Sequence, residues 1–283
     1  MSVQFQRIAR VCEFIQRHLD DELTPVQLSN IAACSRFHFH RLFVAYIGVS
    51  MTRYIQLAKL KRASYQLAFE PLKIIDIALN AGFSSPEAFA RTFKKTLGQT
   101  PSEFRSNADW PQWHQVFQLP NVTTGAHSMQ VKIVEKPTQQ IAYLTHLGDP
   151  QRVLETAGKF IEWRKATGLS PIASSDTFGI PFADPNTVPA EEFRVDIAGT
   201  INTPVPANTF GVQNGEIPGG RFAVLRHLGS HDNLSDSVYA LYRDWLPESG
   251  EELRDFPCFF HWLNFIHEVD ECDLQTDIYL PIK

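Results

Sequence analysis

A segment near the N-terminus recurs fifty residues further along the chain, and this repeat constrains the fold more than any other feature. The first copy reads FHRLF over residues 39–43 and is followed by Gly48. The second copy reads FARTF over residues 89–93 and is followed by Gly98. Each copy comes after a short apolar segment and a turn that contains serine. This order is typical of a helix-turn-helix unit, in which serine caps the second helix.

The apolar residues of the repeat also predict which helix face is buried. In the first copy they recur at spacings of three and four, as in a helical stripe that faces a core: Phe39, Leu42, Phe43 and Tyr46. Shifting this pattern by fifty residues defines the buried face of the second copy. The outward positions of the two helices are then Phe37, His40, Arg41 and Val44 in the first unit and Glu87, Ala90, Arg91 and Lys94 in the second.

A long basic helix is predicted between the two units. Residues 52–69 have helical spacing and carry Lys59, Lys61 and Arg62. Eighteen helical residues span about 27 Å, which is close to the roughly 34 Å between successive major-groove faces of DNA. We therefore expect a rigid connection that places both second helices in neighbouring grooves, with Lys59 and Arg62 on phosphates.

The charge distribution agrees with two different partners for the two halves. Residues 1–115 carry 14 Lys and Arg against 9 Asp and Glu, a net charge of +5, whereas residues 116–283 carry the remaining 12 against 22, a net charge of −10. Clustered cations suit nucleic acid, and an acidic half suits another role. On charge alone, two ordinary solvated surfaces are an equal alternative.

The first half resembles the DNA-binding domain of AraC/XylS-type bacterial transcription regulators, although here the domain leads the chain. The motif is carried by GFSSPEAFARTFKKTLGQTPSEFR over residues 82–105. The resemblance implies an all-α domain over residues 1–107. Arginine reads guanine edges well and Phe can contact a thymine methyl, whereas Glu87 and Ala90 are poorer readers, so we expect the first helix to discriminate more than the second. The positions that the resemblance assigns to base reading are Phe37, His40, Arg41, Glu87, Ala90 and Arg91.

The second half contains its own repeat, with an offset of 81 residues. Residues 141–148 match 222–229 as strands that end at glycine, and each is followed by an amphipathic helix with a tryptophan. Residues 193–197 match 274–278 as later strands. Two tandem strand-helix-strand-strand units predict an α+β domain with a groove where the copies meet. Residues 108–128, rich in turn formers and without a sustained period, are expected to be a linker.

Residues 129–283 resemble the GyrI-like effector-binding domain through LTHLG at 144–148, FADP at 182–185 and the closing PCFFHWLNF and TDIYLPI. That family usually has glutamate where this chain has Phe260. The loss of the acid implies a neutral or aromatic ligand rather than a cationic one, or no ligand at all. Filling of the core is the alternative role for the aromatic residues that we name as effector candidates, which are Trp163, Phe182, Trp245, Phe260 and Trp262.

No catalytic or metal-binding motif accompanies these domains. The four cysteines are scattered without a metal spacing, and the nucleophile-elbow, P-loop and dinucleotide motifs are absent. The matched His146 and His227 are expected to make structural hydrogen bonds. We therefore predict no enzyme activity, no cofactor and no metal. With no signal peptide and no membrane segment in the sequence, a cytoplasmic location is expected.

Taken together, the sequence predicts a DNA-binding transcriptional regulator, with activation as the expected direction. Its expected partners are double-stranded DNA and a small-molecule effector, with RNA polymerase as a further candidate and no membrane. One alternative is a constitutive regulator whose second half is a structural or protein-interaction module. A drug-sequestering or hydrolytic protein is the third reading, and the missing acid at Phe260 counts against it.

Overall fold

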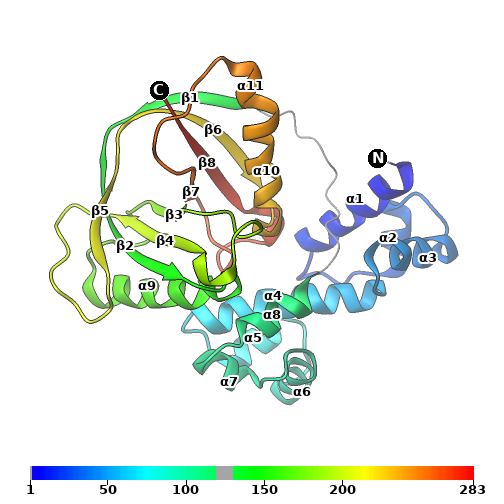
Figure 1. Ribbon diagram of the computed structural model, residues 1–283. Coiled ribbons are helices and arrows are strands. Elements are labelled where there is room, and N and C mark those ends of the chain that lie inside the picture. The colour runs from blue at the N-terminus through cyan, green and yellow to red at the C-terminus, as the bar shows by residue number, and fades with distance from the viewer. Residues whose placement is uncertain (1, 119–129) are drawn as a thin grey trace. The chain divides into compact units, whose positions relative to one another are not determined.

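The computed structural model describes residues 2–118 and 130–283 (Figure 1). It divides into two compact units, which are described separately. The first comprises Met1–His127 together with Ile266–Cys272, and the second comprises Ser128–Phe265 with Asp273–Lys283. The helical first half and the mixed second half confirm the predicted fold class.

Residues 3–117 of the first unit form helices joined by short turns. Its helices are α1 (Val3–Arg17), α2 (Pro25–Ile31), α3 (Arg36–Ile47), α4 (Met51–Phe69), α5 (Ile74–Asn80), α6 (Pro86–Leu97), α7 (Pro101–Ser106) and α8 (Trp110–Phe117). The pairs α2–α3 and α5–α6 are the two helix-turn-helix units that the repeat predicts. Helix α4 is the predicted connection, and its 19 residues span about 28 Å.

The second helices of the two helix-turn-helix units, α3 and α6, begin and end in the same way. Ser35 caps α3 by accepting a hydrogen bond from the amide of His38, and Ser85 caps α6 through the amide of Ala88. Each helix then ends at a glycine in the left-handed region, Gly48 in α3 with φ 81° and its counterpart in α6 with φ 76°. Local capping chemistry therefore fixes the length of both helices.

The predicted linker differs from the structure at its start. Residues 110–117 form helix α8, and Trp110, Trp113 and Phe117 are buried in the first unit. The indole Nε1 of Trp113 donates a hydrogen bond of 2.6 Å to Oγ of Ser64 in α4. Prolines and turn formers concealed this short helix in the sequence. The rest of the predicted linker, residues 119–128, lies outside the described residues.

The second unit is built on one antiparallel sheet. Its strands are β1 (Val131–Lys136), β2 (Gln139–Leu147), β3 (Thr177–Pro181), β4 (Arg194–Thr200), β5 (Gln213–Ile217), β6 (Gly220–Leu228), β7 (Phe259–Trp262) and β8 (Gln275–Ile282). They lie in the order β1-β6-β8-β7-β3-β4-β2-β5. Figure 1 shows the curvature of the sheet, with α9 (Val153–Thr167) on one half and α10 (Leu234–Ala240) on the other.

The strand order reads as the same arrangement from both ends, because each half of the sheet is one copy of the repeat. The predicted units are β2-α9-β3-β4 and β6-α10-β7-β8. Two further strands, β1 and β5, were not predicted. They are exchanged between the copies, since β1 pairs with β6 and β5 pairs with β2. This exchange joins the two repeats into one sheet.

The matched histidines make the same hydrogen bonds in both copies. His146 Nδ1 lies 2.8 Å from Oγ1 of Thr156, and His227 Nδ1 lies 2.8 Å from Oγ of Ser237. The Nε2 atom of each imidazole lies 3.0 Å from a backbone carbonyl oxygen three residues later. Both residues therefore fix the strand end against the following helix, as the sequence predicts.

Candidate DNA-binding helices and effector-binding face

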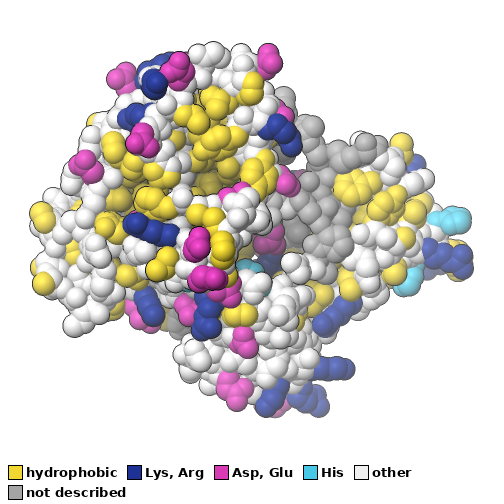
Figure 2. All heavy atoms as spheres, viewed as in Figure 1, with side chains coloured by type: hydrophobic (Ala, Val, Ile, Leu, Met, Phe, Trp, Pro, Cys, Tyr) yellow, Lys and Arg dark blue, Asp and Glu magenta, His cyan; other side chains and the backbone are white. Residues whose placement is uncertain are grey.

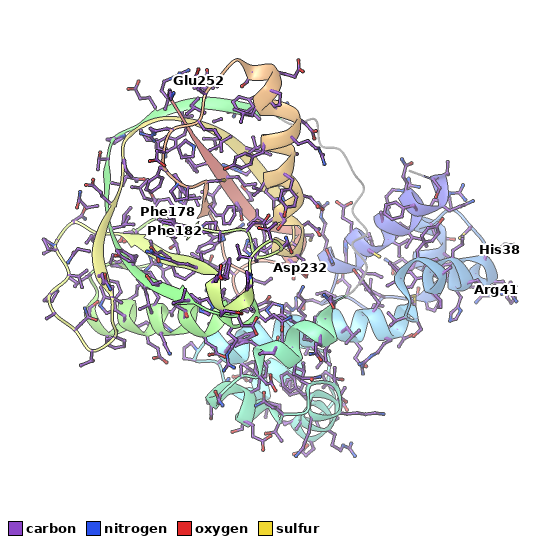
Figure 3. All side chains as sticks on the ribbon, in the orientation of Figure 1. His38, Arg41, Phe178, Phe182, Asp232 and Glu252 are labelled. Atoms are coloured by element: carbon purple, nitrogen blue, oxygen red, sulfur yellow. The ribbon has the colours of Figure 1, made fainter. Side chains whose placement is uncertain are left out.

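Helix α3 presents a cationic face to solvent. Phe37 is 84% exposed, and His40 and Arg41 are exposed as well, while Phe39 and Phe43 of the opposite stripe are buried. Figure 2 shows histidine and Lys or Arg side chains gathered over α3, and Figure 3 shows Arg41 at its outer surface. A helix whose first turns carry exposed Arg and His beside a flat aromatic ring can contact base edges and phosphates.

Helix α6 repeats this arrangement with different side chains. Glu87, Arg91 and Lys94 are exposed, and Ala90 is half-buried. Hydrogen bonds from its own amide and from Ser85 at the helix start lower the pKa of the Glu87 carboxyl. The carboxylate therefore remains charged near neutral pH and would repel a phosphate.

The two cations predicted on α4 have different surroundings. Lys59 is half-buried, with its Nζ close to Gly82. Arg62 is paired with Asp20, lies 3.2 Å from Oδ1 of Asp270 and donates to the carbonyl of Asn80. Because the guanidinium of Arg62 is already held by two carboxylates, its surroundings favour a structural role over phosphate binding. Long-range pairs of this kind leave no signal in helical periodicity.

Four of the five effector candidates lie on the helix-covered face of the sheet. Trp163 and Trp262 belong to the core cluster under α9, and Trp245 and Phe260 belong to the cluster under α10. Phe182 follows β3, is 47% exposed and lies under the Arg194 guanidinium, whose carbon is 4.1 Å from the ring centroid. Phe178 and Phe182 lie within the curve of the sheet (Figure 3).

On the helix-covered face of the sheet, the central strands β3 and β7 bring the two copies of the repeat together. The indole of Trp262 occupies the space beside Gly179, where an added Cβ would lie 2.6 Å from Cη2. Two tyrosines of the second copy were missed by the sequence reasoning, Tyr239 and Tyr242, each 38% exposed. Tyr239 donates a hydrogen bond of 2.6 Å to Asp184, which follows β3 in the other copy. Tyr239 lies in α10 and Tyr242 in the π-helical segment Leu241–Trp245 that follows it, and their spacing of three residues was the available signal.

The electrostatics of the second unit disfavour a buried cationic ligand. Its two buried carboxylates are both neutralised, because Asp196 lies 3.0 Å from Arg194 and Asp277 pairs with Arg226. Arg164 of α9 is buried and donates to Oγ1 of Thr177 at 2.8 Å. Burial lowers the pKa of Arg164 to about 10. Within the described residues of the second unit, no further carboxylate is buried that could pair with a cation.

The described part of the chain contains no group of three His, Cys, Asp or Glu side chains that could hold a metal ion. None of the helices in residues 2–118 and 130–283 combines the length and apolar character needed to cross a bilayer.

Known proteins match both halves. Residues 129–283 match the GyrI-like small molecule binding domain, and residues 28–107 match a helix-turn-helix domain. The probable transcriptional regulator YgiV of Escherichia coli K12 is 44% identical over 155 residues, which cover 55% of this chain and 97% of YgiV. An uncharacterized HTH-type transcriptional regulator of Bacillus subtilis, YbfP, is 37% identical over 99 residues, 35% of this chain and 34% of that protein.

Solved structures give a more distant likeness. The C-terminal domain of EcmrR aligns with 55% of this chain and 98% of that one, with a TM-score of 0.47 and 17% identity. The EcmrR–DNA complex in EcmrR-RPo aligns over 92% and 98% of the two chains, with a TM-score of 0.47 and 16% identity. From its sequence matches, the chain belongs to the GyrI-like family of small-molecule-binding domains and is a transcriptional regulator, not an enzyme, with an AraC-type helix-turn-helix domain ahead of that domain.

Proposed function

We propose that α3 and α6 read two neighbouring major grooves of one DNA duplex and that α4 sets their separation. The observation that carries this proposal is the pair of identically capped helices, each with an exposed arginine at the same position, Arg41 in α3 and Arg91 in α6. Selection of duplexes from a random pool with the full-length chain tests it. We expect enriched sequences with two separate conserved blocks about one helical turn apart.

The same proposal includes a neutral, aromatic effector held on the helix-covered face of the second unit. Both buried carboxylates of that unit are paired with arginine, so a cationic ligand has no counter-charge there. The buried indole Nε1 of Trp163 has no hydrogen-bond acceptor among the described residues. An uncharged ring system that carries an acceptor oxygen or nitrogen satisfies both conditions.

Binding of three fluorescent or optical probes to the full-length chain distinguishes the ligand classes. N-phenyl-1-naphthylamine is neutral, 8-anilinonaphthalene-1-sulfonate is its anionic analogue, and rhodamine 6G is cationic. We expect saturable binding of the neutral probe that Trp262→Ala weakens about tenfold or more. Leu147→Ala, at a residue 68% exposed, is the matched control and should leave binding unchanged. Preference for the cationic probe would contradict the proposed ligand class.

The constitutive regulator is the second candidate function, and one observation favours it. The Trp262 indole fills the space beside Gly179, as a packed core would. If no probe of any charge binds to the folded chain, this candidate replaces the effector proposal.

We also propose that the regulator activates transcription by contacting RNA polymerase. Run-off transcription with purified RNA polymerase on a template that carries the selected site tests this direction. An increase in transcript supports activation, whereas a decrease shows repression.

A further inference from the structure

The exposed face of α3 carries two histidines between two arginines. Arg36, His38, His40 and Arg41 are all exposed. His38 lies three residues before Arg41 and His40 lies four residues after Arg36, so each imidazole neighbours a guanidinium on the helix surface. His38 and Arg41 both lie at the outer surface of α3 in Figure 3.

The elements packed against α3 add little negative charge. Neither imidazole has a described hydrogen bond or ion pair with a carboxylate. Helix α2 has no titratable side chain, and the single carboxylate of α1, Glu13, lies 2.9 Å from Arg17. Helix α4 has no carboxylate. The remaining titratable or charged side chains on these elements are Arg7, Arg10, Cys12, Tyr46, Arg53, Tyr54, Lys59, Lys61, Arg62 and Tyr65, with Cys34 in the turn before α3 and His18, Asp20, Asp21 and Glu22 between α1 and α2.

The second helix-turn-helix unit, α5–α6, lacks this feature. The positions of α6 that match His38 and His40 hold Ala88 and Ala90. The position that matches Phe37 holds the exposed carboxylate of Glu87. Any property that arises from the two histidines therefore belongs to one half of the DNA site.

DNA changes the charge around these imidazoles from positive to negative. In the free protein their charged neighbours on α3 are guanidinium groups, whereas the first turns of a recognition helix lie between phosphates once they enter the major groove. Histidine titrates between pH 5 and 8, and a phosphate favours the imidazolium form. Protons from solvent are then taken up when the helix binds.

We propose that His38 is a further DNA-contacting residue of α3 and that His38 and His40 take up protons on binding. The first helix-turn-helix unit, α2–α3, therefore binds DNA more tightly as the pH falls from 8 to 6. This inference rests on the proposed insertion of α3 into DNA. It predicts a protein whose affinity for one half of its site follows pH while its affinity for the other half does not.

Fluorescence anisotropy with a duplex selected by the full-length chain tests the proposal at constant ionic strength. Uptake of one proton raises affinity about tenfold per pH unit within the titration range. We expect the wild type to bind about tenfold or more tightly at pH 6 than at pH 8. The double variant H38Q/H40Q should lose this dependence, so that its affinities at pH 6 and pH 8 agree within about threefold.

A reciprocal variant adds pH-dependent DNA binding to the second helix-turn-helix unit. Ala90→His places an imidazole on α6 at the position that matches His40, and it should steepen the pH dependence. The dependence on salt gives a second readout, because each added phosphate contact changes the slope of log K against log salt by about 0.9. For the wild type that slope should be steeper at pH 6 than at pH 8.

The possible failures are distinguishable. Selection that enriches no duplex overturns the proposed function. Specific binding with the same affinity at pH 6 and 8, or unchanged pH dependence in H38Q/H40Q, overturns the histidine inference alone. An A90H variant without added pH dependence also contradicts it. Circular dichroism checks that each variant is folded.

Discussion

The indole of Trp262 lies against the backbone of Gly179 in the neighbouring strand, so that a Cβ at Gly179 would come within 2.6 Å of Cη2. The backbone of Gly179 does not have a positive φ, so its conformation does not require glycine. Glycine is required at this position because the neighbouring indole leaves no room for a Cβ. The contact joins β7 of the second copy to β3 of the first. It places the Trp262 ring where the two repeats meet.

This contact predicts non-additive effects on stability. Gly179→Ala should cost about 1–3 kcal/mol through overpacking, and Trp262→Ala about 2–4 kcal/mol because it leaves a cavity. In the Trp262→Ala background the added methyl has room, so the double variant should cost clearly less than the sum of the two. Urea unfolding of the full-length chain measures all three, and strictly additive costs would show that the two residues do not share this space.

Removal of the Ser64 hydroxyl should destabilise the first unit. Ser64→Ala leaves the buried Nε1 of Trp113 without its acceptor at 2.6 Å, at a cost of about 1–3 kcal/mol. Ser102→Ala, an exposed serine, is the control. Thermal unfolding followed by helical circular dichroism should separate the two variants. Equal melting temperatures would mean that α8 is not held to α4 by this hydrogen bond.

The second unit should lose stability in mild acid. Burial lowers the pKa of both His227 and His261 from the ordinary value of about 6.5. Between the folded and unfolded pKa values the unfolded chain binds more protons, so stability is present above about pH 6.5 and is lost as the pH falls below it. The melting temperature of the wild type should drop between pH 7 and 5. His261→Gln should flatten this dependence, and an unchanged slope would assign the effect to other groups.

Substitution of a matched arginine should change DNA affinity in a sequence-dependent way, whereas substitution of a phosphate-binding cation should not. Arg41→Ala should cost about 1–3 kcal/mol on the selected duplex and less on random DNA, whereas Lys94→Ala should weaken both similarly and reduce the salt slope by about one. Anisotropy titrations on the two duplexes measure this difference. An equal loss on selected and random DNA for Arg41→Ala would show that Arg41 contacts phosphate and does not read bases.

Local sequence patterns predicted the elements that local chemistry determines. The Phe39–Phe43 stripe, its copy at Phe89 and Phe93, and the serine caps defined α3 and α6, because capping and periodicity act within a few residues. The offset of 81 residues defined the two halves of the sheet in the same way. The outward positions on these helices follow from the same periodicity.

Features that depend on distant residues were not predictable. The pairing of Arg62 with Asp20 and Asp270 joins segments 42 and 208 residues apart, and the exchange of β1 and β5 depends on the closure of the whole sheet. Helix α8 is stabilised by the burial of Trp113 against α4 more than by its own short sequence. The face on which each effector candidate lies also required the sheet register.

Hydroxyl-radical footprinting of the full-length chain on a selected duplex tests the central claim most directly. Two recognition helices joined by α4 should protect two patches on one side of the duplex, centred about 10 base pairs apart. Arg41→Ala should weaken one patch and Arg91→Ala the other. A single protected patch, or the same patch weakened by both variants, would contradict the reading of DNA by α3 and α6 together.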